Sequence, residues 1–248
     1  MGRRKEADLR ARFTGSVPLI VGLLLAVGVG TVVVLRAGPP GASSDGELLT
    51  RGHKIYEARC ARCHGVEGDG MGRYAEDLDT PPADFTRGVF KFRSTPSGSL
   101  PTDEDLMRTL ERGVRGTAML PWPSLSRGEK RVVIVRLKAF SEWFEGGEEP
   151  AVVEVGSPPK LDEETLRQGR ALYLEAGCAK CHGEEGRGDG PRAGDLTDDL
   201  GRPVRPPDFT RGLFKTGQGV AGIYRTLVTG LDGTPLPSQA EAYTPEQL

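Results

Sequence analysis

Cysteine and histidine are scarce in this chain, which has four cysteines and three histidines among 248 residues. All four cysteines lie in two short motifs, so none is left for a structural disulfide elsewhere. The formal net charge of −2 gives no reason to expect nucleic acid or a strongly charged partner. Aromatic residues make up only 6 %, against 35 glycines and 19 prolines. This composition predicts one or two small, loop-rich domains, which often need a metal or cofactor to stay folded.

The two cysteine motifs are copies of one pattern. Residues 60–65 read Cys-Ala-Arg-Cys-His-Gly, and residues 178–183 read Cys-Ala-Lys-Cys-His-Gly. Cys-x-x-Cys-His is the attachment signature of a c-type haem. Two thiols at this spacing can add to the two vinyl groups on one edge of a porphyrin, and the histidine that follows can ligate the iron. The pattern predicts two covalently bound haem c groups, held by Cys60, Cys63, His64, Cys178, Cys181 and His182.

Paired cysteines have two other common uses. The four thiolates could share one zinc ion, or each pair could act as a thioredoxin-like dithiol. Both copies, however, carry histidine and glycine at the same next positions, and their surroundings contain no βαβ pattern. These features favour haem attachment over zinc binding and over dithiol chemistry.

An uncharged run from Phe13 to Leu35 precedes both motifs. It is long enough to span a bilayer, which takes about 20 apolar residues. Basic residues dominate before it, so the positive-inside rule predicts a cytoplasmic segment 1–16, a transmembrane helix 17–36 and an extracytoplasmic remainder. A cleaved signal peptide is the alternative, but its apolar region would usually be shorter and no clean Ala-x-Ala site follows Leu35.

The remainder of the chain is an internal duplication. Asp-Phe-Thr-Arg-Gly occurs at residues 84–88 and again at 208–212, and Phe-Lys follows shortly after each copy. Gly-x-x-Gly-Thr recurs at 113–117 and 230–234. We therefore expect a linker over 37–46, one domain over 47–145, an interdomain linker over 146–160 and a second domain over 161–248.

Periodicity and capping signals predict helices in both domains. Each domain should open with a helix that leads into its motif, and Asp162 is the expected N-cap of the second. Thr-x-x-Asp at 102–105 begins a further helix, whose counterpart should run over about 219–227. Ser-x-x-Glu at 126–129 begins a longer one. Its apolar face should run through Val133, Leu137, Phe140 and Phe144. Thr-Pro-Glu-Gln at 244–247 announces another helix just where the sequence stops, so we expect a truncated closing helix in the second domain.

Residues 46–248 resemble two tandem class I cytochrome c domains of the membrane-anchored bacterial type. The resemblance rests on the two motifs and on the Gly-Thr-x-Met loop at 116–119. It implies an all-α fold in which the first and last helices of each domain cross and the haem lies in a crevice. With the predicted anchor, the expected fold class is an N-terminal transmembrane helix followed by two cytochrome c-like haem domains. The family also implies that His64 and His182 are the proximal iron ligands.

The resemblance implies that Met119 is the distal ligand of haem 1, with Met107 and Met71 as alternatives. A His/Met pair raises the haem potential and suits an electron carrier. At the matching position of the second domain stands Leu236, which cannot ligate iron. Haem 2 is then five-coordinate, or bound by water, by another subunit or by an unusual group such as Lys215 or Tyr243. The third histidine, His53, is expected at the surface of the first helix.

The repeated Asp-Phe-Thr-Arg-Gly segment is expected in the haem crevice. Arg87 and Arg211 could pair with haem propionates, and Phe85 and Phe209 could pack on the porphyrins. The alternative is a structural loop kept by duplication. By the family's habit, carbonyls near Pro81, Pro82, Pro206 and Pro207 should accept the ring N–H of each proximal histidine.

The sequence therefore predicts a membrane-anchored dihaem cytochrome c on the outer side of the cytoplasmic (inner) membrane. It would pass electrons between its haems and to redox partner proteins, in a respiratory complex or another redox chain. In this interpretation it is not an enzyme, and no residue acts as acid, base or nucleophile. The alternative is a haem enzyme or a gas- or peroxide-binding sensor that uses an open site on haem 2. Against it stands the lack of an obvious acid–base residue, although Asp232 is near in sequence.

Overall fold

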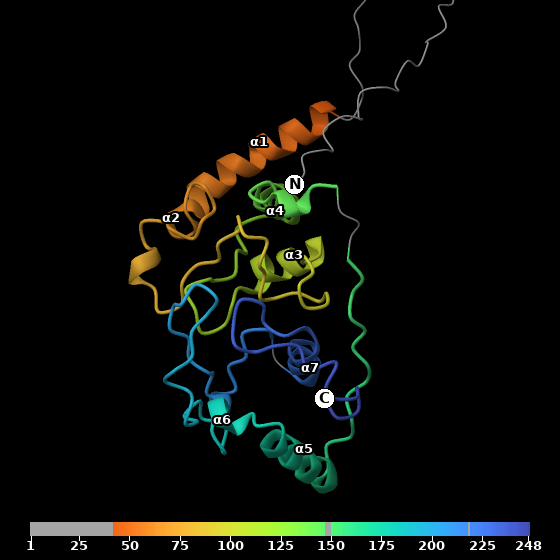
Figure 1. The fold of residues 1–248 in the computed structure, drawn as a ribbon. Helices are drawn as coiled ribbons and strands as arrows, with labels where there is room; N and C mark the ends of the chain where they lie inside the picture. The colour runs from red at the N-terminus through yellow and green to blue at the C-terminus, as the bar shows by residue number, and fades with distance from the viewer. Residues whose placement is uncertain (1–41, 147–149, 218) are drawn as a thin grey trace, which may run out of the picture. The chain divides into compact units, whose positions relative to one another are not determined.

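A computed structural model of the chain describes residues 42–146, 150–217 and 219–248 (Figure 1). Within these ranges the regular secondary structure is helical, and β pairing is limited to an isolated bridge between Thr197 and Pro203. None of the helices in these ranges has both the length and the apolar character needed to cross a membrane. The predicted anchor 17–36 and the segment 1–16 lie outside the described residues.

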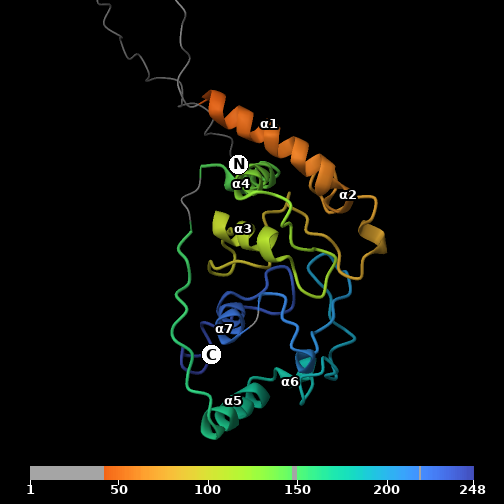
Figure 2. The same ribbon diagram turned by 180° about the vertical axis from the view of Figure 1, so that it is seen from behind.

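The first repeat is built around two helices that pack on each other. Its elements are α1 (Ala42–Arg59), α2 (Ala61–His64), η1 (Ala75–Asp77), α3 (Asp103–Arg112), α4 (Arg127–Lys138) and η2 (Glu142–Phe144). Both α1 and α3 pack against α4, and α1 lies beside α4 in both views (Figures 1 and 2). A Cβ added at Gly52 in α1 would overlap the carbonyl oxygen of Val132 in α4. Glycine at this position therefore allows the close approach of the first and last helices.

Capping boxes fix the start of α3 and of α4, as predicted. The Thr102 hydroxyl accepts a hydrogen bond from Asp105 N at 3.2 Å, and the Asp105 carboxylate accepts one from Thr102 N at 3.1 Å. Ser126 and Glu129 exchange the same pair of bonds at the start of α4. These bonds satisfy N–H groups that would otherwise lack a partner in the first helical turn.

The end of α4 differs from the prediction, because the helix stops at Lys138, before Phe140 and Phe144. Ser141 accepts the N–H of Trp143 with its hydroxyl and so starts the short helix η2 instead of continuing α4. The break turns the Phe140 ring toward the first haem motif, where a Cβ added at Gly68 would lie 2.6 Å from it. Both phenylalanines still pack against the core.

A single buried cluster forms the core of the first repeat. Its members come from α1, α3, α4 and the loop after the first motif, namely Tyr56, Phe85, Phe90, Leu106, Met107, Leu110, Val133, Ile134 and Leu137. Met119 and Trp122 pack against it while remaining partly exposed. The core therefore reaches from the α1–α4 crossing to the motif and to the loop that carries Met119.

The second repeat is more open. Its elements are α5 (Glu163–Glu175), α6 (Ala179–His182), η3 (Phe209–Arg211) and α7 (Val220–Thr229). Asp162 caps α5 by accepting from Thr165 N at 3.0 Å, and α7 lies within two residues of its predicted bounds. No residue of α5 is buried. At Gly169, the counterpart of Gly52, an added Cβ would have no atom within 4 Å, so the described residues place no helix across α5 there.

Arg93 joins the two repeats. Its side chain is fully buried, pairs with Asp232 at 2.8 Å and donates to the carbonyl of Thr229 at 2.7 Å. The Asp232 carboxylate also accepts from the Ser97 hydroxyl at 2.8 Å and from Gly98 N at 2.9 Å. Buried polar groups are favourable only when they are satisfied in this way, so these contacts hold the loop after α7 on the first repeat.

Candidate haem sites

Each motif folds into a single helical turn that places its reactive groups on one face. His64 N donates to Cys60 O at 3.0 Å, and His182 N donates to Cys178 O at 2.9 Å. Both thiols and the histidine of a motif fall at positions i, i+3 and i+4, which share one face of a helix. All four thiols are free, as thioether formation requires. Among the described residues no three Cys, His, Asp or Glu side chains converge on a possible metal position.

A tyrosine before each motif ties the turn after it to the preceding helix. Tyr56 donates its hydroxyl to Gly65 O at 2.7 Å, and Tyr173 donates to Gly183 O at 2.6 Å. Burial raises the pKa of Tyr56 well above its ordinary value, so its hydroxyl stays protonated and remains a donor. The sequence signal that could have revealed this role is a tyrosine shortly before each motif, four residues ahead of Cys60 and five ahead of Cys178.

The first histidine is held by one of the expected carbonyls. Nδ1 of His64 lies 3.1 Å from the carbonyl oxygen of Ala83, directly after Pro81 and Pro82, which leaves Nε2 available as a ligand. Burial lowers the pKa of His64, and the bond to Ala83 opposes that effect only in part. The net shift favours neutral imidazole, the form that binds metals.

The second histidine is held less tightly. Nδ1 of His182 is buried but makes no hydrogen bond of regular geometry within the described residues. Burial lowers the pKa of His182, while the nearby carbonyl of Pro207 acts in the opposite direction. Because Pro207 matches Ala83 in the repeat, we interpret it as the same support in a looser position.

The repeated Asp-Phe-Thr-Arg-Gly segment positions an aromatic ring on each histidine. The Phe85 ring stacks on His64 with centroids 4.7 Å apart, and the Phe209 ring stacks on His182 at 4.5 Å. The backbone N–H of each phenylalanine donates at 2.7 Å to a carbonyl of the Gly-rich turn after the motif. The phenylalanines therefore orient the candidate ligands from the side.

The two arginines of the segment lie in different surroundings. Arg87 makes a bidentate ion pair with Asp199, at 2.6 and 3.2 Å, and so links the two repeats. Arg211 is exposed and does not line the haem cavity. The segment turns locally instead, since its aspartate accepts the N–H and O–H of the threonine two residues on. Arg211 therefore does not fit the propionate prediction, whereas Arg87 lines the haem cavity while paired with Asp199, so its propionate contact stays a prediction.

One continuous cavity of about 1920 Å³ contains both motifs. Its volume exceeds the ~300–1,000 Å³ of a typical small-molecule site, as a cavity for two macrocycles should. Its lining includes every residue predicted to hold haem, namely Cys60, Cys63, His64, Met119, Cys178, Cys181 and His182. The residues present thus fit two haem c groups, and the two crevices open into each other.

The loop that carries Met119 is repeated in backbone detail around Leu236. Val114 N donates to Met119 O at 2.7 Å, and Leu231 N donates to Leu236 O at 2.9 Å. In each loop a threonine hydroxyl accepts the N–H of the residue in question, at 3.1 Å for Met119 and 3.3 Å for Leu236. Both residues line the cavity. The duplication has therefore kept these backbone bonds of the loop while the side chain at the ligand position has changed.

Of the other candidate iron ligands, the two methionines lie outside the haem cavity and the two unusual groups line it. Met107 is a core residue at 3 % exposure, and Met71 is 72 % exposed; neither lines the cavity. His53 pairs with Glu57 at 3.5 Å on the surface of α1, as expected. Both unusual candidates for haem 2, Lys215 and Tyr243, do line the cavity.

Asp232, mentioned above as an acid–base residue near the open site of haem 2, does not act there. It belongs to the Arg93 bridge and is absent from the cavity lining.

Two cytochrome c-type crevices on one chain define a tandem, electron-carrying class of haem protein, and comparisons with known proteins agree. Residues 47–135 match the family model of cytochrome c oxidase, cbb3-type, subunit III, and residues 166–248 match the cytochrome c model. A chain of the Kuenenia stuttgartiensis reducing HAO-like protein complex is 45 % identical, with a TM-score of 0.77. That match covers 79 % of this chain and 90 % of the other. The chain belongs to the dihaem class I c-type cytochromes and carries two covalent haem c groups.

Curated relatives come from Helicobacter pylori. The cbb3-type cytochrome c oxidase subunit CcoP of strain 52 is 24 % identical over 145 residues, which is 57 % of this chain and 39 % of CcoP. The CcoP of strain ATCC 700392 / 26695 is 24 % identical over 144 residues, with 57 % and 40 % covered. The chain thus spans about two fifths of the length of these relatives.

Proposed function

We propose that this chain is a membrane-anchored electron carrier that receives and donates electrons through two haems inside a respiratory or other redox complex. The observation that carries the proposal is the single cavity lined by both motifs. When bound, each haem supplies one-electron chemistry, and the protein supplies burial, orientation and ligands. Because the two crevices are joined, an electron can pass between the haem sites without crossing bulk water.

The residues of this chain have separate roles in the proposal. The cysteines of each motif would hold the macrocycle through thioether bonds, and His64 and His182 would each supply a ligand to an iron. Ala83 O and the Phe85 ring hold the His64 imidazole in one orientation. Met119 would be the second ligand of haem 1, and a thioether ligand raises the reduction potential. No acid, base or nucleophile is assigned.

The experiment is a redox titration of the full chain in detergent, followed by absorption and EPR. We expect two one-electron steps, and Met119→Ala should lower the potential of one step and change its spin state. After partial reduction, the electron should redistribute between the haems faster than it leaves to a slow external acceptor. An unchanged potential in Met119→Ala would contradict the ligand assignment. Absence of exchange between the haems would contradict the carrier.

We further propose that segment 17–36 anchors the protein in the cytoplasmic membrane, with segment 1–16 inside and the haem domains outside. The motivating features are the uncharged run and the basic residues before it. Support comes from the relatives, which are an oxidase subunit and a chain of a multi-protein complex. Protease added to spheroplasts should digest the haem domains while the protein stays in the membrane fraction. Full protection would reverse the topology.

A second candidate function is ligand binding or peroxide chemistry at haem 2. It is favoured by one observation, the placement of Leu236 in a loop built like that of Met119. Under this proposal, haem 1 feeds electrons to an open site on haem 2. A high-spin haem that binds carbon monoxide and turns over peroxide would support it. Two low-spin haems that ignore carbon monoxide would leave only the carrier.

A further inference from the structure

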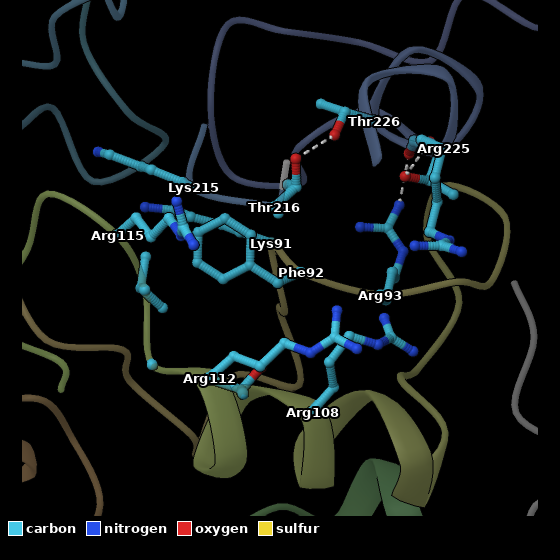
Figure 3. Close-up of a pocket in the computed structure, with 15 residues that line it drawn as sticks. Lys91, Phe92, Arg93, Arg108, Arg112, Arg115, Lys215, Thr216, Arg225 and Thr226 are labelled. Atoms are coloured by element: carbon cyan, nitrogen blue, oxygen red, sulfur yellow. Dashed lines mark hydrogen bonds between the residues drawn. The ribbon is translucent and has the colours of Figure 1, made fainter. Parts of the chain in front are cut away.

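A second cavity, of about 420 Å³, lies between α3 of the first repeat and α7 of the second (Figure 3). Arg108 and Arg112 enter it from α3, and Arg225 enters from the opposite wall. Lys91, Arg115 and Lys215 lie together at one side of it (Figure 3). With Arg93, seven cationic side chains line this basic pocket, and no aspartate or glutamate does.

Most of these cations have no carboxylate partner. Arg93 pairs with Asp232 and Arg108 pairs with Asp105, at 2.8 and 2.7 Å. For the other five, no ion pair forms within the described residues. Nε of Arg225 is in addition buried without a hydrogen-bond partner there. Gathering like charges in a partly desolvated pocket is unfavourable unless an anion joins them.

The basic pocket adjoins the haem cavity. Lys91 and Lys215 line both, and they are matched positions of the repeat, each directly after a phenylalanine that faces the haem cavity. Burial lowers the pKa of Lys91, and the charge of Lys215 acts in the same direction. Asp198 and Asp199 raise the pKa of Lys91, but Asp198 is paired with Arg202 and Asp199 with Arg87.

None of the four cysteines and neither motif histidine lines the basic pocket. The pocket is thus separate from the edge at which each macrocycle is attached. Each haem carries two propionate carboxylates on pyrroles other than those that bear the thioether bonds. These carboxylates are anions that the bound cofactors would themselves supply.

We propose that the basic pocket is a shared propionate site, in which carboxylates from both haems meet cations contributed by both repeats. Lys91 and Lys215 are positioning residues at its entrance, and Arg112 and Arg225 supply further charge. The inference rests on the two covalent haems and not on the proposed partner or membrane location. One consequence is that the two reduction potentials depend on the same cations.

The test is a redox titration of full-length Lys91→Gln and Lys215→Gln in detergent. A nearby cation favours the reduced iron, so each substitution should lower both potentials. The equilibrium constant for reduction should fall on the order of tenfold, which is about 59 mV for a one-electron couple. Lys91→Arg should retain the wild-type values. A shift confined to one haem in both variants would overturn the shared site, and so would no shift in either.

Matched controls separate a local from a general charge effect. Lys54→Gln removes the same charge from the exposed face of α1, outside both cavities, and should leave both potentials unchanged. The haem content of each variant, measured as the pyridine haemochrome, verifies that it carries both haems. If a lysine variant does not load, Arg112→Gln, at the exposed rim of the basic pocket, replaces it and should lower both potentials.

A free oxyanion such as phosphate could supply the same negative charge to the basic pocket as the propionates. Potentials of the wild-type protein are therefore compared in phosphate and in chloride at equal ionic strength. Equal values support propionates as the resident anions. A phosphate-dependent shift that disappears in Arg112→Gln would overturn the proposal and assign the basic pocket to a free anion.

Discussion

Replacing Leu236 with methionine should give haem 2 a sixth ligand and close it to carbon monoxide. The loop already holds residue 236 as it holds Met119, through backbone bonds of 2.9 and 2.7 Å to the carbonyls of the two residues. Leucine and methionine have similar volumes, and swaps of this kind usually cost less than about 1.5 kcal/mol. Leu236 is only half-buried, which reduces the cost further. The fold should therefore survive while a thioether replaces a methyl group.

The size of the effect follows from competition at the iron. Carbon monoxide must displace the new thioether, so every 1.4 kcal/mol of the iron–sulfur bond lowers the apparent affinity tenfold. A bond worth about 3 kcal/mol would lower that affinity roughly 100-fold. The potential of haem 2 should rise at the same time. The assay is a carbon monoxide titration of the reduced full chain, followed by absorption, with EPR of the oxidised form.

The reciprocal variant Met119→Leu is the matched control, because it should open haem 1 to carbon monoxide and leave haem 2 as it is. If Leu236→Met binds carbon monoxide as tightly as the wild type, the two loops do not present residues 119 and 236 alike. The likeness of the two loops in their backbone bonds would then not extend to where the two side chains lie. If haem 2 is low-spin before any substitution, another group such as Lys215 or Tyr243 occupies the site.

Three further predictions concern stability. Gly169→Ala should stabilise the protein by about 1 kcal/mol, because alanine favours the helix and the space around Gly169 is open. Gly52→Ala should destabilise it by roughly 1–3 kcal/mol through overpacking against α4. Thermal unfolding followed by circular dichroism compares the two variants, and equal effects would contradict the α1–α4 contact. Arg93→Gln should cost about 3 kcal/mol by leaving the buried bridge incomplete, and urea unfolding that matches the wild type would refute this. Burial alone would raise the pKa of Asp105, but hydrogen bonds from Ser94, Thr102 and Arg108 lower it below its ordinary value of 3.8. The stability that this carboxylate contributes should be complete above pH 3.8 and lost as pH falls below it, so the difference between wild type and Asp105→Asn in urea unfolding should shrink on acidification.

Local signals in the sequence predicted much of the scaffold. The capping residues Thr102, Ser126 and Asp162 were identified correctly because a cap depends on side chains within three residues of it. The motifs were equally clear, since attachment depends on spacing within a single helical turn. The predicted propionate partners Arg87 and Arg211 were a different case. Whether an arginine meets an aspartate 112 positions away or a cofactor depends on how the repeats dock. A sequence pattern carries no such information.

The same limit explains why the basic pocket could not be predicted. Its cations come from separate segments of both repeats, and no short window of the sequence contains an unusual number of them. Lys91 and Lys215 carried a weak signal, because each follows a matched phenylalanine. Only the tertiary structure places both of them at the junction of two cavities.

The two haem sites share several supports, but they differ in the distal residue and in how firmly the proximal histidine is held. The tyrosine bond to the motif, the phenylalanine on the histidine and the threonine bond in the distal loop are all present twice. A repeat that had lost its function would be expected to lose some of these supports. The second repeat has kept these three supports, although Leu236 replaces the distal methionine and Nδ1 of His182 makes no hydrogen bond within the described residues. The same scaffold, placed on one cavity with two different distal residues, would make the two haems unequal in potential or in access. Such an inequality gives electron flow between them a direction.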